Sequence, residues 1–187
     1  MQRSAHERVQ VPHREQVYLY SQDFWRYDLA VVACPFFYPT ERVSLGWPFP
    51  ARLPLGAGFA GTCHAGGAET TPSETELRDF CNLGYAEGCP RLPADRFADN
   101  VRFAVARDED SRIVLHYVSE RFHQPVEYGR LEYDCGMKRW LAPMRDHCLQ
   151  RQAECFVSVY LERRPRAARM PSDSAIDPAG NPGEERE

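Results

Sequence analysis

The chain has 187 residues, of which 43% are hydrophobic and 27% are charged, with a formal net charge of −4 and a pI near 5.9. This length fits one globular domain of about 150 residues with flexible ends. The negative net charge argues against a general binder of polyanions, because affinity for a phosphate backbone depends on basic surface. We therefore expect no nucleic-acid partner.

The first segment, residues 1–16, is polar and of mixed charge, and it lacks the apolar core of about 7–15 residues that a signal peptide carries. No run approaches the roughly 20 apolar residues that a membrane span needs. We therefore expect a cytoplasmic protein with no membrane contact. In a reducing compartment a cysteine-rich chain more often binds metal or reacts through a thiol than forms disulfides, and the seven cysteines here are an odd number.

Residues 1–16 are predicted to be a flexible arm, and residues 17–164 a single globular domain. At its start, residues 17–20 suit a short strand, and residues 23–33 suit a helix that ends before Pro35. Residues 35–67 contain five prolines and six glycines, which predicts a long irregular segment. A loop of this length in a compact domain is usually functional or fastened by something, and a metal would serve.

A helix is predicted from residue 71 to about residue 83. The sequence Thr-Pro-Ser-Glu at residues 71–74 has the form of a capping box with proline at the first helical position, and Gly84 suits the end of the helix. This prediction places Cys81 in the last helical turn.

From Val101 onward apolar side chains recur at every second position, which is typical of a half-buried strand. Strands are predicted from residue 101, over 113–119 and over 130–135, with a turn at 108–111. Residues 143–163 carry apolar side chains at helical spacing, whereas residues 165–187 are polar and rich in proline, which predicts a disordered tail. The sequence therefore predicts an α+β fold: a short antiparallel β-meander of three or more strands packed by a C-terminal helix, with a long irregular N-terminal half rich in cysteine, proline and glycine.

Four of the cysteines fall within 56 residues, each within three positions of a glycine or proline: Cys34, Cys63, Cys81 and Cys89. Loop backbone can wrap a metal and offer N–H groups to the sulfurs. The wide spacing lacks the Cys-x-x-Cys pairs usual at zinc sites, whereas iron–sulfur clusters accept dispersed ligands and a proline after a ligand cysteine. We therefore predict that these four thiolates hold an iron–sulfur cluster of the 4Fe-4S type, with zinc as the second choice.

Four protein thiolates would leave no coordination position open to a substrate, so electron transfer, redox sensing or structural stapling is favoured over catalysis. The alternative is a metal-free protein-interaction domain with buried structural cysteines, since free cysteine is among the most buried residue types. Its partner would bind the aromatic N-terminal half, which contains Tyr18, Tyr20, Phe24, Trp25, Tyr27 and residues 47–50. A thiol enzyme is a third hypothesis.

Other candidate residues have simpler interpretations. His64 and Cys135 are reserve ligands, and we expect His64 to be exposed. Cys148 and Cys155 are interpreted as small core residues of the C-terminal helix. A further set could act in acid–base chemistry, although a solvated strand edge has the same pattern: His116, Glu120, His123 and Glu127.

Overall fold

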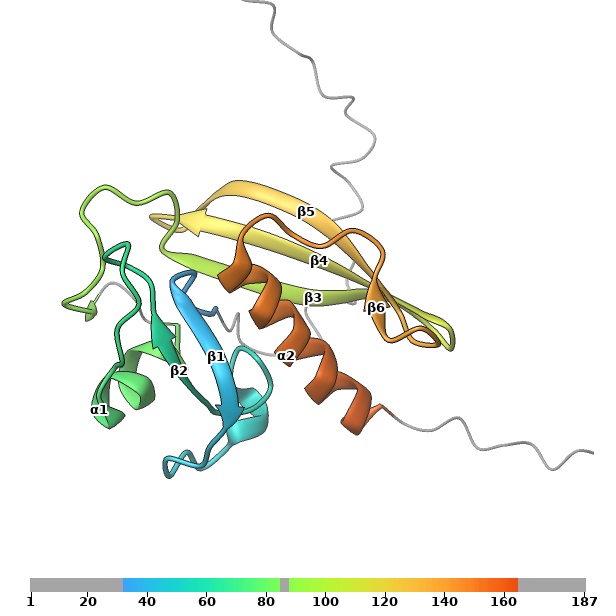
Figure 1. The fold of residues 1–187 in the computed structure, drawn as a ribbon, viewed down its shortest axis with the longest axis horizontal. Helices are drawn as coiled ribbons and strands as arrows, with labels where there is room; N and C mark the ends of the chain where they lie inside the picture. The colour runs from blue at the N-terminus through green and yellow to red at the C-terminus, as the bar shows by residue number, and fades with distance from the viewer. Residues whose placement is uncertain (1–31, 85–87, 165–187) are drawn as a thin grey trace, which may run out of the picture.

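The structure is a computed structural model, and it describes residues 32–84 and 88–164. Over these residues it has two antiparallel sheets and a long C-terminal helix (Figure 1), which confirms the predicted α+β class. In the described ranges no helix has both the length and the apolar content needed to cross a bilayer. Four predicted segments lie wholly or mostly outside the description: the arm 1–16, the strand 17–20, the helix 23–33 and the tail 165–187.

The larger sheet is a meander in which each strand pairs with the next along the chain. Its four strands are β3 (Asn100–Glu109), β4 (Arg112–Arg121), β5 (Gln124–Asp134) and β6 (Arg139–Trp140). The first hairpin turns at the predicted place, because Glu109 pairs with Arg112. The period-two pattern therefore predicted this sheet correctly.

The second hairpin of the meander differs from the prediction, because β5 begins at Gln124 and not at residue 130. Arg121 pairs directly with Gln124, which leaves Phe122 and His123 as a two-residue turn with φ angles of 51° and 61°. Such turns usually contain asparagine or glycine, which tolerate positive φ. Phe-His carries no such signal, so the early start of β5 was not apparent from the sequence.

Residues 35–67 were predicted to be a long irregular segment, and the structure shows two short strands within it. These are β1 (Phe37–Arg42) and β2 (Phe59–Cys63), which form a two-stranded antiparallel sheet, joined by a loop with a short 3-10 turn at Pro50–Arg52. The strands approach closely at Gly61, where a Cβ atom would lie 2.2 Å from the carbonyl oxygen of Tyr38. Proline and glycine are unfavourable inside strands, so their presence here argued against strands at the level of the sequence.

The helix predicted from residue 71 to about 83 is shorter and begins later. The capping box is formed by Ser73 and Glu76, whose side chains each accept a hydrogen bond from the other's backbone N–H, at 3.2 and 2.7 Å. One short stretch, α1 (Glu74–Glu76), passes directly into a π-helical turn, η4 (Leu77–Cys81). As predicted, Cys81 lies in the last turn of this helical segment.

The C-terminal helix, α2 (His147–Arg163), packs against both sheets (Figure 1). It begins four residues later than the predicted 143, because Asp146 is the N-cap and accepts a hydrogen bond from the Leu149 N–H at 3.0 Å. Facing the meander, Ala153 and Val157 pack with Ile113, Leu115 and Leu131; on another side, Leu149, Cys155 and Val159 pack with Phe37 and Phe59. The helix is thus the shared core element of the two sheets.

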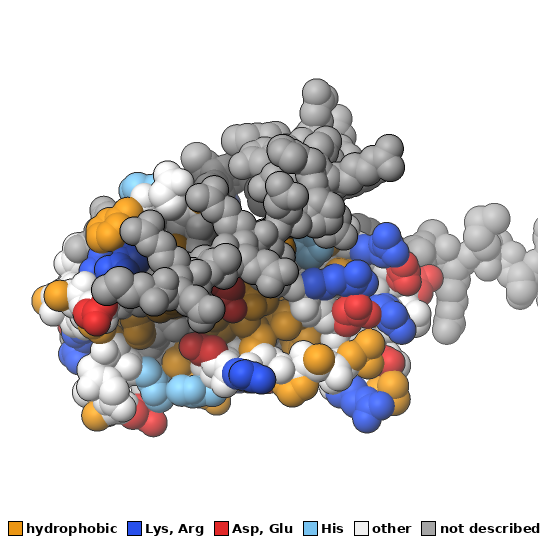
Figure 2. Space-filling view, turned by 90° about the horizontal axis from the view of Figure 1, so that it is seen from above, with side chains coloured by type: hydrophobic (Ala, Val, Ile, Leu, Met, Phe, Trp, Pro, Cys, Tyr) orange, Lys and Arg blue, Asp and Glu red, His pale blue; other side chains and the backbone are white. Residues whose placement is uncertain are grey.

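On the face seen in Figure 2, basic side chains are interspersed with acidic ones, so no large patch of one sign is visible there. Of the aromatic residues predicted to form a partner surface, those from Tyr18 to Tyr27 lie outside the described residues. Trp47 donates a hydrogen bond to the carbonyl oxygen of Arg78 at 3.4 Å, whereas Phe49 is 65% exposed.

Candidate metal centre

The four cysteines singled out in the sequence line one cavity. Its wall also includes apolar side chains and one ion pair, so that the full lining is Cys34, Phe36, Phe37, Cys63, Ala65, Glu76, Phe80, Cys81, Cys89, Arg91 and Leu92. Cys34, Cys63 and Cys81 are buried and Cys89 is half-buried. All seven cysteines of the chain are described, and all are free thiols.

Cys34 is held by three parts of the fold. The residue before it, Ala33, forms a pair of backbone hydrogen bonds of 2.7 and 2.9 Å with Val101 of β3. The carbonyl oxygen of Cys34 accepts hydrogen bonds from the N–H of Phe37 at 3.1 Å and from the buried side chain of Gln152 at 2.9 Å. The Cys34 backbone is therefore fixed to β3, β1 and α2 at once.

Cys63 ends β2 and is fixed by a second backbone pairing. Its N–H donates to the carbonyl oxygen of Thr70 at 2.8 Å, and the Thr70 N–H donates back at 3.0 Å. The chain between them folds back as a tight loop, so Cys63 stays at the edge of the cavity.

Cys81 owes its position to the π-helical turn and to the residue that follows. The Asn82 N–H donates to the Leu77 carbonyl at 3.1 Å, which closes the wider turn. The buried side chain of Asn82 then accepts from the Phe59 N–H at 2.8 Å and donates to the Phe59 carbonyl at 2.9 Å. These two bonds join the end of η4 to the start of β2, so that Cys81 and Cys63 face one space.

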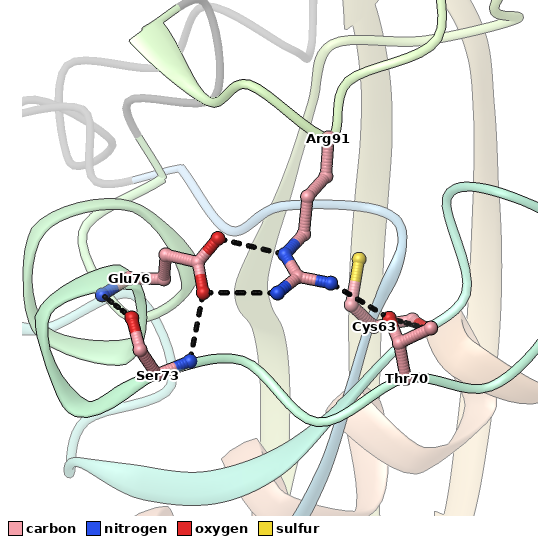
Figure 3. A network of polar contacts seen from close by, with 5 residues as sticks. All are labelled: Cys63, Thr70, Ser73, Glu76 and Arg91. Carbon is pink, nitrogen blue, oxygen red and sulfur yellow. Dashed lines mark hydrogen bonds and ion pairs between the residues drawn. The ribbon is translucent and has the colours of Figure 1, made fainter.

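Cys89 belongs to a segment that Arg91 ties to the helix and to the Cys63 loop (Figure 3). The guanidinium donates two hydrogen bonds to the Glu76 carboxylate, at 2.7 and 3.1 Å, and one to the Thr70 hydroxyl at 3.0 Å. The pKa of Arg91 is raised, first by its hydrogen bond to Glu76 and further by the charges of Cys63 and Cys89. The Arg91 guanidinium is thus held in place in the cavity wall, near Cys63 in Figure 3.

Burial is the main influence on the acidity of two of the four thiols. Burial raises the pKa of Cys34 to about 12, and the charges of Cys63 and Cys89 add to the effect. Burial also raises the pKa of Cys81 well above its ordinary value, with further contributions from the other three cysteines. Such thiols stay protonated at neutral pH until a cation takes the place of the protons.

The spacing of the sulfurs bears on which metal the cavity suits. A tetrahedral ion with metal–sulfur bonds of about 2.3 Å holds its sulfurs about 3.8 Å apart. Among the described residues, the one group of three or more potential ligands whose atoms all lie within 4.8 Å of one another is His64, His147 and Cys148. No three of the four cavity cysteines are that close, so the described structure does not present them at the spacing that a single ion requires.

The other candidate cysteines and His64 lie outside the wall of the cysteine cavity. Cys155 is buried in the core, and Cys135 is half-buried near the end of β5, outside the cavity wall. His64 is half-buried rather than exposed, because it packs against Tyr38 and His147. Cys148 is buried as predicted, but its sulfur lies 3.6 Å from Nε2 of His147, a residue that sequence reasoning missed. Burial raises the pKa of Cys148 to about 12, with smaller contributions from Asp146 and Cys63.

The predicted acid–base set is not assembled into one site. Glu120 forms an ion pair of 2.8 Å with Arg102, and Glu127 accepts a hydrogen bond of 3.2 Å from the Tyr117 hydroxyl. Burial lowers the pKa of His116, and His123 occupies the β4–β5 turn. The members thus have separate surroundings, as on an ordinary sheet.

No family model, no curated protein and no solved structure matches this chain.

Proposed function

We propose that Cys34, Cys63, Cys81 and Cys89 hold an iron–sulfur cluster, and that the protein works in electron transfer or redox sensing, with the cluster also stapling the fold. One observation carries the proposal: four cysteines from separate segments line the same cavity. This convergence supports a shared ligand over four independent structural thiols. We place the protein in the cytoplasm, where reducing conditions keep thiols free for metal.

Within such a site the chain's own residues have distinct tasks. The four thiolates would complete the coordination by protein, while Phe36, Phe37 and Phe80 would limit access of water to the sulfurs. A bound cluster supplies one-electron redox chemistry. Arg91 would offset negative charge beside Cys63 and Cys89, and Glu76 holds its guanidinium in place.

The exposure of the site to solvent bears on whether its role is redox or purely structural. Cys89 is half-buried, whereas the other three cysteines are buried. The site is therefore nearest to solvent on the side of Cys89, where a redox partner or a small oxidant would approach. A fully enclosed cluster would favour the structural role alone.

The test is anaerobic purification followed by measurement of iron, acid-labile sulfide and visible absorbance. We expect a brown protein in which Cys81→Ser and Cys89→Ser lose iron, while Cys155→Ser keeps it. Cys155 is the matched control, because it is buried like Cys81 but lies outside the cavity wall.

Two results would contradict the cluster. Zinc that is lost in the same two variants would replace it with a single ion. A folded, colourless protein without metal would favour the metal-free interaction domain.

A further inference from the structure

A second group of potential ligands lies beside the cysteine cavity. His64 Nδ1 is 3.3 Å from His147 Nε2, and His147 Nε2 is 3.6 Å from Cys148 Sγ. All three ligand atoms lie within 4.8 Å of one another. Two of the residues begin α2 and the third follows β2, so the group joins two elements of the fold.

These separations match those in a tetrahedral zinc site. Zinc binds imidazole nitrogen at about 2.0–2.1 Å and thiolate sulfur at about 2.3 Å, which places two nitrogens about 3.3 Å apart and nitrogen and sulfur about 3.6 Å apart. Both of the values given above agree with this geometry. The remaining pair, His64 Nδ1 and Cys148 Sγ, lies within 4.8 Å and would have to close toward about 3.6 Å when the ion binds.

The surroundings of His64 resemble those of a metal-bound histidine. Its other ring nitrogen, Nε2, lies 3.1 Å from the Thr62 hydroxyl. With the proton on Nε2, the ring donates to Thr62 and directs the Nδ1 lone pair toward His147, and such a partner on the second nitrogen is the usual support of a ligating histidine. The Tyr38 ring lies 5.8 Å from both imidazole rings and shields one side of the group.

We propose that His64, His147 and Cys148 form a second metal site, specific for a divalent ion of the zinc type. The Cys148 thiol releases its proton to solvent when the ion binds, and water completes the tetrahedron. Solvent can reach the site because His147 is exposed, although Cys148 is buried. None of the three is among the four cysteines proposed to hold the cluster, so neither site requires the other.

The experiment is an anaerobic titration of the full chain with Co(II), which reports tetrahedral binding through its visible bands and thiolate binding through a sulfur-to-cobalt band in the near ultraviolet. We expect the wild type to bind one equivalent more than His147→Ala. Since His147 is exposed, this substitution should leave folding intact. Thr62→Val should keep the site but weaken it about 10- to 100-fold.

His123→Asn is the matched control, because asparagine tolerates the positive φ of that turn and His123 lies outside the group. It should bind as the wild type does. Equal cobalt stoichiometry in the wild type and His147→Ala would overturn the proposal and leave the two imidazoles as a hydrogen-bonded pair. Iron measured on the same samples tests the cluster separately, and cobalt bound by empty cavity cysteines would appear equally in both proteins.

Discussion

Two buried amides, Asn82 and Gln152, join the segments that carry the cavity cysteines. Asn82 bonds to Phe59 of β2 and also donates to the Leu77 carbonyl at 2.9 Å. Gln152 donates to the carbonyl oxygens of Cys34 and Phe37, at 2.9 and 2.7 Å. A buried backbone group that loses its partner costs about 1–3 kcal/mol, so such side chains do more for stability than most surface contacts.

For this reason Asn82→Ala should lower the free energy of unfolding by about 2–3 kcal/mol, because it leaves the Phe59 N–H and carbonyl without partners. Urea unfolding of the metal-free protein measures the loss. Ser158→Ala, at an exposed position of α2, should stay within about 0.5 kcal/mol of the wild type. An Asn82→Ala protein of wild-type stability would show that these bonds contribute nothing.

The Glu76 carboxylate gives a prediction about pH. Its hydrogen bond to Arg91, followed by that to the Ser73 backbone, lowers the pKa of Glu76 from 4.5 to about 2. The ionised form is thus favoured in the folded state, so its contribution is complete above pH 4.5 and disappears as the pH falls toward 2. Glu76→Gln should cost about 1 kcal/mol at neutral pH, after allowance for solvent screening, and almost nothing near pH 2.

Denaturant midpoints at about pH 7, 4 and 2.5 would measure this difference. Glu69→Gln changes an exposed carboxyl and is the control. A difference between wild type and Glu76→Gln that is constant over this range would contradict the role of the ionised pair.

At the scale of elements, the chain that follows η4 approaches the backbone of Val32 so closely that only glycine fits there. Gly84 has a φ of +70°, and a Cβ atom there would lie 1.3 Å from the Val32 carbonyl oxygen. Gly84→Ala should therefore destabilise the protein by about 3 kcal/mol or more, among the largest single-residue effects. A Cβ atom at Gly66 would meet nothing within 4 Å, so Gly66→Ala should be nearly neutral and is the control. Thermal unfolding of both variants decides the point.

The β4–β5 turn can be improved. His123 has a φ of 61°, a conformation that costs an L-residue about 1–2 kcal/mol and glycine almost nothing. His123→Gly should raise the free energy of unfolding by about 1 kcal/mol. Phe122 should be kept, because the guanidinium groups of Arg96 and Arg121 lie 5.7 and 5.3 Å from its ring. A lower melting temperature for His123→Gly would mean that the imidazole has a stabilising contact.

Elements with a regular apolar period could be predicted, and those without one could not. The alternation from Val101 predicted β3, and the helical spacing predicted α2. The pairing of β1 with β2 depends on contacts distant in sequence, and the capping box formed at Ser73 although Thr71 offered an equally good pattern. Local sequence preference cannot distinguish two neighbouring N-cap candidates when tertiary contacts decide which of them begins the helix.

At the scale of the whole molecule, the cavity joins parts of the chain that lie far apart in the sequence. A ligand that binds only the folded state stabilises it by mass action. Removal of metal by an anaerobic chelator should therefore lower the melting temperature of the wild type and speed proteolysis near Cys89. A variant that combines Cys81→Ser with His147→Ala, and so lacks a ligand of each proposed site, should melt at the same temperature with and without chelator, and a wild type that does the same would contradict the coupling of metal to folding.

The two candidate sites differ in how far the sequence could reveal them. Four cysteines near glycine or proline stood out by residue type alone. The histidine group did not, because His64 and His147 are 83 positions apart and nothing local relates them. The packing of α2 against β1, the strand that pairs with β2, brings the two rings to a centroid distance of 4.9 Å.

The hydrogen bond from Gln152 to the Cys34 carbonyl spans 118 positions of the chain, and this bears on how the protein is made. During synthesis at about 5–20 residues per second, Cys34 leaves the ribosome about 6 to 24 seconds before the residue that fastens it. Throughout that interval its thiol is open to oxidants and to stray metal ions. The Cys34 backbone gains this bond only when α2 has been made and packed. Any metal held at Cys34 would therefore settle into an almost finished polypeptide, and protection of the nascent thiol falls to the cell rather than to the fold.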